Sequence, residues 1–426
     1  MSDPNPCARA GLPHRGAVLA LLLAATASTA VAAAPLGFAE ALHLAVERAP
    51  QLDARRSRAA AAREELARAD ALPDPKLMAG IQNLPIGGSD AFSVEADRMT
   101  MRRIGLSQEF PSRAKRQARR VRAEAELVEA RAEGIATELE VQRAAAEAWI
   151  TLWAAEREFA NLKALEEQSE LAVSASRARL SGGGGMATDV LAARSAELEL
   201  ANRLVSTETR IAQARAALAR WLGAAPESVA ANAPEFRRAP LAKAALLAQL
   251  DRHGDLLLWD AREAAAEAEL ELERAEKRPD WALSGGYAQR GADASDAVWL
   301  EVSIDLPLFA RNRQDRGIAA RRAELDAVHA EREAARRAQV ERVGSLFAAW
   351  SGLRQQVQRH EAQILPLAED RAEIALAAFS GGAPLQAWID ARRDDLAVRT
   401  LHAEMLARLG RAWVELAFLL PQESAE

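Results

Sequence analysis

The feature of this sequence that most constrains its fold is an internal duplication. Residues 36–222 and residues 241–420 present the same parts in the same order. Each half opens with a short helical stretch, continues with a helix that ends at a proline–aspartate pair, and then shows two segments of strand character. A long helix follows, reaches a serine–glycine break and is succeeded by a return helix. Such a repeat predicts two equivalent units that pack on one another.

The parts of the two repeats can be placed on the sequence from these signals. In the first repeat, residues 33–222, we expect strands over about 76–86 and 99–110, a long helix over 113–180, a tip at 181–188 and a return helix. In the second, residues 241–426, we expect strands over about 281–290 and 298–309, a long helix over 311–379, a tip at 380–386 and a return helix. Residues 223–240 contain prolines and are expected to join the repeats as a loop.

The long helix of the first repeat has the pattern of a coiled coil. The segment 113–180 contains one glycine and no proline, and as an unbroken helix it would span roughly 100 Å. Its apolar residues recur every seven positions in two classes, which are Val121, Val128, Ile135 and Trp149, and Ala125, Ala132, Leu139, Ala146 and Trp153. Sustained heptads with many small residues predict close helix packing. The composition, with 27% charged and 4% aromatic residues, is also typical of long helices.

The predicted strands have a different period. In VWLEVSIDL, every second residue is apolar and falls on one face: Val298, Leu300, Val302, Ile304 and Leu306. The residues between them, Trp299, Glu301, Ser303 and Asp305, fall on the other face. Such alternation over about nine residues suits a strand that crosses a bilayer. The segment MTMRRIGLSQEF carries Arg102 and Arg103 in its middle, so its faces are mixed. Four strands cannot close a barrel in lipid, where open edges are not tolerated, so we expect either a small soluble sheet or strands pooled from several copies.

The N-terminus has the pattern of a secretory signal. Arg9 and Arg15 precede an apolar run that ends in small residues, which predicts a cleaved signal peptide over residues 1–32. Cys7, the only cysteine, lies before that run, so disulfides and thiolate metal sites are excluded from the mature chain. No other segment approaches the length of a transmembrane helix. The net charge of −6 argues against a nucleic-acid partner.

The four consecutive glycines Gly182–Gly185 permit two interpretations. A phosphate-binding loop would need a preceding strand and a lysine followed by serine or threonine after the glycines. Here a helix precedes them and Met186-Ala187 follows, so we expect a hairpin tip, where glycine supplies the positive φ at which a helix ends.

The ordered set of parts resembles the TolC-type outer-membrane efflux factors, the exit ducts of tripartite efflux and type I secretion systems. The resemblance covers nearly the whole mature chain and depends on the duplicated order, on ALPDP and KRPDW before the strands, and on LSQEFP and IDLPLF after them. The run NLPIGG … MTMRRIGLSQEFP is most similar to the heavy-metal efflux branch, whose members serve copper/silver and cobalt/zinc/cadmium systems.

The resemblance implies a mainly α fold with a small membrane β part. Duplicated long helical hairpins of three copies would form a periplasmic α-barrel, and four strands from each copy would form a twelve-stranded barrel in outer-membrane lipid. It also implies a homotrimer, a periplasmic adaptor and an inner-membrane pump of the RND type. The adaptor-contacting tips carried over are Ser181, Gly182, Gly183, Gly184, Gly185, Ser380, Gly381 and Gly382.

Two aspartates are candidates for the periplasmic entrance of the pore. In the family, aspartates line this entrance just after the second tip; Asp390 matches one of them, and Asp189 holds the equivalent site in the first half. The position of the other family aspartate is Ala387 here, so the entrance ring is expected to be weaker or differently built. Helix capping and stabilisation of the first turn are the alternative roles for both aspartates.

No catalytic motif or cofactor site is expected. Met78, Met99 and Met101 lie on or near predicted strands; thioethers suit Cu(I), but we interpret these residues as apolar barrel or loop residues. The histidines have no ligand spacing and are expected at the surface or in packing: His43, His253, His329, His360 and His402. The predicted function is a passive duct for heavy-metal cations, with multidrug efflux and type I secretion as alternatives. A periplasmic adaptor or a coiled-coil scaffold is the alternative from another class.

Overall fold

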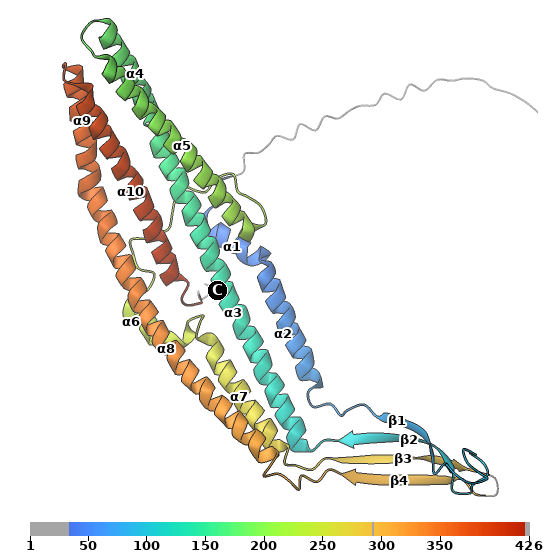
Figure 1. Cartoon of the computed structure of the whole chain (residues 1–426). Coiled ribbons are helices and arrows are strands. Elements are labelled where there is room, and N and C mark those ends of the chain that lie inside the picture. The colour runs from blue at the N-terminus through green and yellow to red at the C-terminus, as the bar shows by residue number, and fades with distance from the viewer. Residues whose placement is uncertain (1–33, 292–293, 422–426) are drawn as a thin grey trace, which may run out of the picture. The chain divides into compact units, whose positions relative to one another are not determined.

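Two long helical hairpins and one four-stranded sheet make up the folded part of the chain (Figure 1). The computed structural model describes residues 34–291 and 294–421, so the expected signal peptide and Cys7 lie outside the described residues. All elements named below belong to one unit that begins at Pro35. No helix in the described ranges has the length and apolar character needed to cross a membrane.

The elements follow the duplicated order. The first repeat contains α1 (Phe38–Arg48), α2 (Pro50–Arg68), β1 (Lys76–Gln82), β2 (Met101–Phe110), α3 (Arg113–Lys163), α4 (Glu166–Ser181) and α5 (Ala187–Leu222). The second contains α6 (Lys243–Ala248), η1 (Leu250–Arg252), α7 (Leu257–Ala275), β3 (Trp281–Arg290), β4 (Ala297–Ile304), α8 (Gln314–Arg359), η2 (His360–Ile364), α9 (Leu365–Ser380) and α10 (Leu385–Ala417). The expectation of a mainly helical fold with a small four-stranded sheet is confirmed.

Neither long helix is continuous, in contrast to the expectation for 113–180 and 311–379. The first breaks at Ala164 and Leu165, where Leu165 joins a buried cluster with Leu162, Leu200 and Leu204. The second passes through one turn of π-helix, η2, immediately before Pro366. Proline lacks an N–H and its ring collides with the carbonyl four residues earlier, so a wider turn relieves the clash.

The two heptad classes of α3 have different surroundings. Most of the second class is buried within the chain, including Ala125, Leu139 and Ala146. In the first class Trp149 is fully buried, whereas Val121, Val128 and Ile135 are 39%, 52% and 44% exposed. Within one chain, therefore, only part of the predicted seam is occupied, and an apolar stripe on α3 remains on the surface.

The main core lies where the two repeats meet the loop that joins them. Buried residues of α1, α3, α5, α8 and α10 belong to one hydrophobic cluster. Three tryptophan indole N–H groups donate to carbonyls of the joining loop: Trp153 to Ala231, Trp350 to Phe236 and Trp413 to Arg238, all at 2.9–3.0 Å. The buried indoles of Trp153 and Trp350 need such a partner, and the three bonds together tie the loop to both repeats.

The sheet is antiparallel throughout, in the order β1-β2-β3-β4. It lies at the end of the helical hairpins opposite the two tips (Figure 1). Strand β4 ends at Ile304, earlier than the expected 298–309, because the Asp305 N–H donates to the Asp280 carbonyl and Pro307 cannot donate to a strand partner. Strand β1 is likewise shorter than expected and stops at Gln82.

Candidate functional site

The first tip is a glycine-terminated hairpin between α4 and α5. Gly182 N–H donates to the Ala178 carbonyl at 3.0 Å, and Gly184 N–H donates to the Arg179 carbonyl at 3.0 Å. Gly183 has φ +77°, the left-handed conformation that glycine adopts without strain. A side chain at Gly185 would lie 3.1 Å from the Arg179 Cβ and the Leu180 nitrogen. The tip therefore needs glycine for both its backbone angles and its close packing.

The second tip repeats this geometry between α9 and α10. Gly381 N–H donates to the Ala377 carbonyl at 3.1 Å, and Ala383 N–H donates to the Ala378 carbonyl at 3.0 Å. Gly382, with φ +104°, is the counterpart of Gly183. Both terminal serines, Ser181 and Ser380, donate their hydroxyls to carbonyls within their own helices. The two tips are thus equivalent structures at the same end of the molecule (Figure 1).

Arg179 joins the two tips. Its guanidinium donates from Nη1 to the carbonyls of Phe379 at 3.1 Å and Ala383 at 3.3 Å, and from Nη2 to that of Gly382 at 3.4 Å. The same guanidinium lies over the Phe379 ring, 4.7 Å from its centroid. Carbonyls at a helix C-terminus carry partial negative charge and favour a cation. This contact was not expected from the sequence, where Arg179 is one of several arginines in a charged helix.

A small apolar cluster lies beneath the tips. It combines residues of the first hairpin with residues of the second: Ala172, Val173, Ala193, Phe379, Leu385, Trp388 and Ile389. All seven are buried. The tips therefore pack against one another through side chains as well as through Arg179.

The two candidate aspartates lie near the starts of the return helices, Asp189 in the first turn of α5 and Asp390 in the second turn of α10, and they have different contacts. Asp189 accepts a hydrogen bond from the Met186 N–H through Oδ2 at 3.1 Å, which caps the start of α5. Asp390 is exposed and accepts from the Gln386 side chain at 2.8 Å. Asp189 thus has a capping role within the chain, whereas the Asp390 carboxylate faces solvent.

A buried aspartate, which the sequence did not single out, lies further along α10. Asp395 is 0% exposed and accepts from Arg392 at 2.9 Å and from Arg399 at 2.8 Å. Burial lowers the pKa of Arg392, although the neighbouring Asp395 opposes that shift. The i−3 and i+4 spacing of the two arginines is the signal that was available in the sequence.

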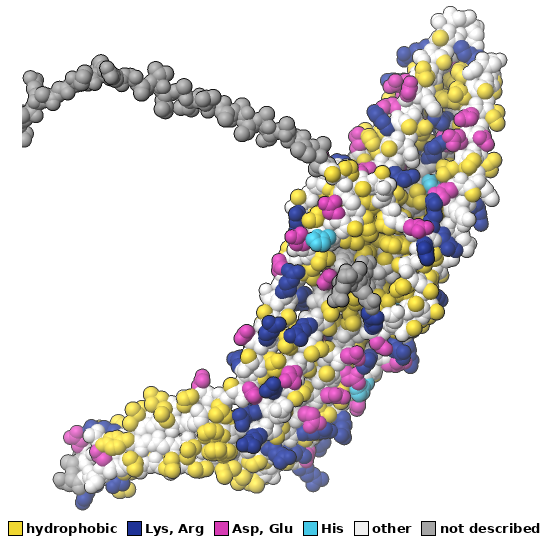
Figure 2. Space-filling view, turned by 180° about the vertical axis from the view of Figure 1, so that it is seen from behind, with side chains coloured by type: hydrophobic (Ala, Val, Ile, Leu, Met, Phe, Trp, Pro, Cys, Tyr) yellow, Lys and Arg dark blue, Asp and Glu magenta, His cyan; other side chains and the backbone are white. Residues whose placement is uncertain are grey.

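The strand pairing separates the sheet into two chemically different faces. The first face is apolar. Its cross-strand neighbours are Leu77 and Leu106, Ile104 and Tyr287, Leu283 and Val302, and Trp281 and Ile304. On β4 the apolar side chains Val298, Leu300, Val302 and Ile304 are 84%, 76%, 58% and 57% exposed. Figure 2 shows hydrophobic side chains gathered along the strands, with few charges among them. An exposed apolar surface of this kind marks contact with a membrane or a partner.

The opposite face of the sheet is polar. It carries Ser107 and Ser284, whose hydroxyls bond at 2.8 Å, together with the Lys76–Glu109 ion pair and Glu301. The register also resolves the mixed segment of β2: Arg102 lies on the apolar face opposite Gln289, and Arg103 lies on the polar face opposite Ala288.

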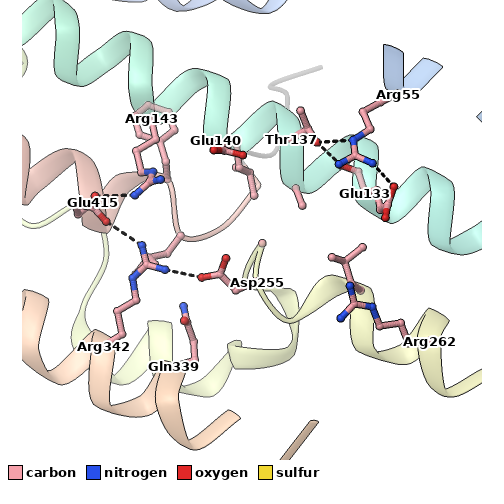
Figure 3. Close-up of a pocket in the computed structure, with 16 residues that line it drawn as sticks. Arg55, Glu133, Thr137, Glu140, Arg143, Asp255, Arg262, Gln339, Arg342 and Glu415 are labelled. Atoms are coloured by element: carbon pink, nitrogen blue, oxygen red, sulfur yellow. Dashed lines mark hydrogen bonds and ion pairs between the residues drawn. The ribbon is translucent and has the colours of Figure 1, made fainter. Parts of the chain in front are cut away.

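A charged cavity of about 480 Å³ lies between the repeats (Figure 3). Arg342 links Glu415 at 3.0 Å with Asp255, and Arg143 reaches the same Glu415 at 2.8 Å. Burial acts to raise the pKa of Glu415, but Arg143 and Arg342 outweigh it and the pKa is lowered. Burial and the nearby Glu415 raise the pKa of Glu147. Arg143, Arg342 and Glu415 pair with one another, and these ion pairs hold α3, α8 and α10 together around the cavity.

The methionines singled out in the sequence do not converge, whereas two of the histidines, His360 and His402, stack with ring centroids 6.2 Å apart. Met78 and Met101 lie on the polar face of the sheet at different levels, and Met99 lies in the loop before β2. His253 is buried between the Leu246 carbonyl and the Gln339 side chain, and its burial lowers its pKa. Within residues 34–291 and 294–421, no group of three or more histidine, cysteine, aspartate or glutamate side chains could hold a metal ion.

This chain shares its fold, duplicated helical hairpins on a four-stranded sheet, with solved outer membrane channels. Residues 41–224 match the family described as outer membrane efflux protein, and the fold extends the likeness over the second repeat. The family match covers 184 of the 426 residues, all from the first repeat and the start of the joining loop. No curated protein matches the sequence significantly.

Several solved structures share the fold. A membrane protein from Pseudomonas aeruginosa is 18% identical, with a TM-score of 0.76 and coverage of 90% of both chains. The MtrE outer membrane channel of Neisseria gonorrhoeae is 17% identical, with a TM-score of 0.74 and coverage of 90% of this chain and 88% of its own. The outer membrane protein VceC of Vibrio cholerae is 18% identical, with a TM-score of 0.72 and coverage of 89% and 94%.

Proposed function

We propose that three copies of this chain form a passive duct that carries solute across the periplasm and the outer membrane. The observation that carries the proposal is the two-faced sheet, apolar and exposed on one side and polar on the other. Strands that alternate in this way suit a barrel with lipid outside and water inside. The duct hydrolyses nothing; an inner-membrane pump supplies the energy.

The edges of the sheet support assembly from several copies. Within the described chain, β1 and β4 each pair on one side only. Unpaired strand edges are not tolerated in lipid. Pairing β4 of one copy with β1 of the next closes the sheet, and three copies with four strands each give twelve strands. The exposed stripe of Val121, Val128 and Ile135 on α3 is an apolar surface that neighbouring copies would cover.

The partners and cargo follow from the resemblance to efflux ducts. The tips would meet a periplasmic adaptor connected to a pump of the RND type, and they would stay shut until the adaptor engages. Heavy-metal cations are the proposed cargo because of the run NLPIGG … MTMRRIGLSQEFP. A strain lacking this protein should become sensitive to copper, silver, zinc, cobalt or cadmium; sensitivity to antibiotics alone would instead favour multidrug efflux.

Fractionation and conductance test the duct itself. The mature protein should enrich in outer membranes, migrate as a trimer in mild detergent and conduct ions in planar lipid bilayers. An adaptor or a scaffold would show neither the trimer nor the conductance. A water-soluble monomer without affinity for bilayers would refute the proposal.

Replacing Gly182–Gly185 by four alanines should impair export without preventing trimer assembly. Alanine at Gly183 is strained by about 1 kcal/mol at φ +77°, and alanine at Gly185 meets backbone 3.1 Å away. Minimal inhibitory concentrations in a complemented deletion strain measure the effect. Gly134→Ala is the matched control, because a Cβ there meets nothing within 4 Å. Normal export by the four-alanine variant would exclude a role for the first tip.

A further inference from the structure

Trp299 lies flat against the polar face of the sheet, over two glycines on neighbouring strands. A Cβ at Gly105 would lie 2.7 Å from the indole Cζ2, and a Cβ at Gly286 would lie 2.9 Å from the indole Nε1. Glycine inside a strand weakens it and marks a close approach. Backbone atoms lie equally close or closer, the Gly285 oxygen at Gly105 and the Ile104 oxygen and Gly105 Cα at Gly286, so these glycines admit both the neighbouring strand and the ring.

The Trp299 indole makes a cation–π contact with an arginine. The guanidinium of Arg103 stacks over the Trp299 ring, with its Cζ 4.1 Å from the ring centroid. Arg103 also donates to the Gln82 side chain at 2.6 Å. Among the described residues no carboxylate forms an ion pair with Arg103, in contrast to Arg102, which pairs with Glu95 at 2.9 Å. The stack thus orients a cation whose charge is not neutralised.

The register places this cation in a half of the polar face that lacks acidic residues. From Met101 to the level of Gly105, the polar face carries Gln82, Gly80, Met78, Arg103, Ala288, Gly286, Ala297, Trp299 and Arg290. Glu301 and Glu109 lie nearer the helices, at the levels of Ser107 and beyond. The half of the sheet farther from the helices therefore has two positive charges per chain and no negative one on this face.

We propose that Arg103, stacked on Trp299, forms with its symmetry mates a belt that attracts anionic solutes at the outer end of the duct. The inference rests on the proposed function, because it requires the polar face to line a water-filled lumen. Charges along a low-dielectric wall concentrate counter-ions. The belt would raise the local concentration of anionic solutes, including anionic complexes of the metals proposed as cargo.

The local potential can be measured with a cysteine beside the belt. Met101→Cys places a thiol on the same face two residues from Arg103, about 7 Å away, and the expected cleavage of residues 1–32 leaves it the only thiol of the mature chain. Outer-membrane vesicles are treated with a negatively charged and a positively charged methanethiosulfonate of similar size, and the ratio of the two reaction rates is recorded. Arg103→Gln should lower the anionic-to-cationic ratio about fivefold. Arg103→Lys, which keeps the charge, should retain the ratio.

Two further variants distinguish a failure of the proposed belt from a failure of the proposed duct. Arg102→Gln, the adjacent arginine on the apolar face, should change the ratio less than about twofold. An unchanged ratio in Arg103→Gln, or a Met101→Cys thiol that neither reagent reaches, would overturn the belt. Leu300→Cys on the apolar face should be unreactive when covered by lipid. If it reacts as fast as Met101→Cys, the membrane-embedded sheet itself is wrong, whatever the result at Arg103.

Discussion

Replacing Asp395 by alanine should lower the free energy of unfolding by about 2–4 kcal/mol. The carboxylate is fully buried and is the shared acceptor for Arg392 and Arg399. Without it, two partly buried guanidinium groups lose a compensating charge, a large cost in a site that excludes water. Arg392 keeps Gln168 and Arg399 keeps Glu369 at 3.5 Å, so we expect a value below that for an entirely unpaired buried ion.

The neighbouring aspartate provides the control for this measurement. Asp394 is exposed and contacts Arg371 at 2.6 Å on the surface, so Asp394→Ala should cost less than about 1 kcal/mol. Thermal unfolding of both variants in the same detergent, followed by circular dichroism, gives the comparison. Equal melting temperatures for the two variants would show that the buried network does not stabilise this region.

Replacing Arg179 by alanine should raise the conductance of the duct in planar bilayers. Three hydrogen bonds and the stack on Phe379 hold one tip to the other in each chain. Hydrogen bonds from a charged donor contribute about 1.5–3 kcal/mol, so their loss should shift each chain's equilibrium toward open tips about tenfold or more. The trimer should still assemble, because the apolar cluster beneath the tips is unchanged.

Arg177 is the matched control for Arg179. It lies one half-turn earlier on α4 and is exposed, so Arg177→Ala removes the same charge without touching the second tip. Its conductance should equal that of the unaltered protein. If Arg179→Ala also shows unaltered conductance, the contact between the tips does not keep the duct shut.

Structural features that depend only on neighbouring residues in the sequence could be predicted. The alternation in VWLEVSIDL depends only on the period of a strand, and Val298, Leu300, Val302 and Ile304 indeed share an exposed face. The two glycine tips could be predicted from the signals that end a helix, and each tip holds one positive-φ glycine, Gly183 or Gly382. Pro366 is a sequence signal for the interruption of the second long helix, because proline disfavours a regular helical turn before it.

The remaining features depend on contacts between distant parts of the chain. Arg179 meets carbonyls about 200 residues away, and nothing in its local sequence distinguishes it from Arg177. The opposite orientations of Arg102 and Arg103 follow from the strand register, which period-two alternation alone does not determine in a mixed segment. The role of Gly105 and Gly286 likewise becomes apparent only in the structure, where the neighbouring backbone and the Trp299 ring both approach them closely.

The interruptions of the two long helices occur at corresponding depths. Both α4 and α9 have 16 residues, so each hairpin carries a discontinuity about four turns before its tip. Flexing at this level would displace only the terminal segments, and the sheet and the tryptophan-anchored core would stay in place. The duplication has thus kept a break at the same depth in both hairpins, and in the proposed duct the two breaks would let the periplasmic mouth dilate while the membrane seal stays intact.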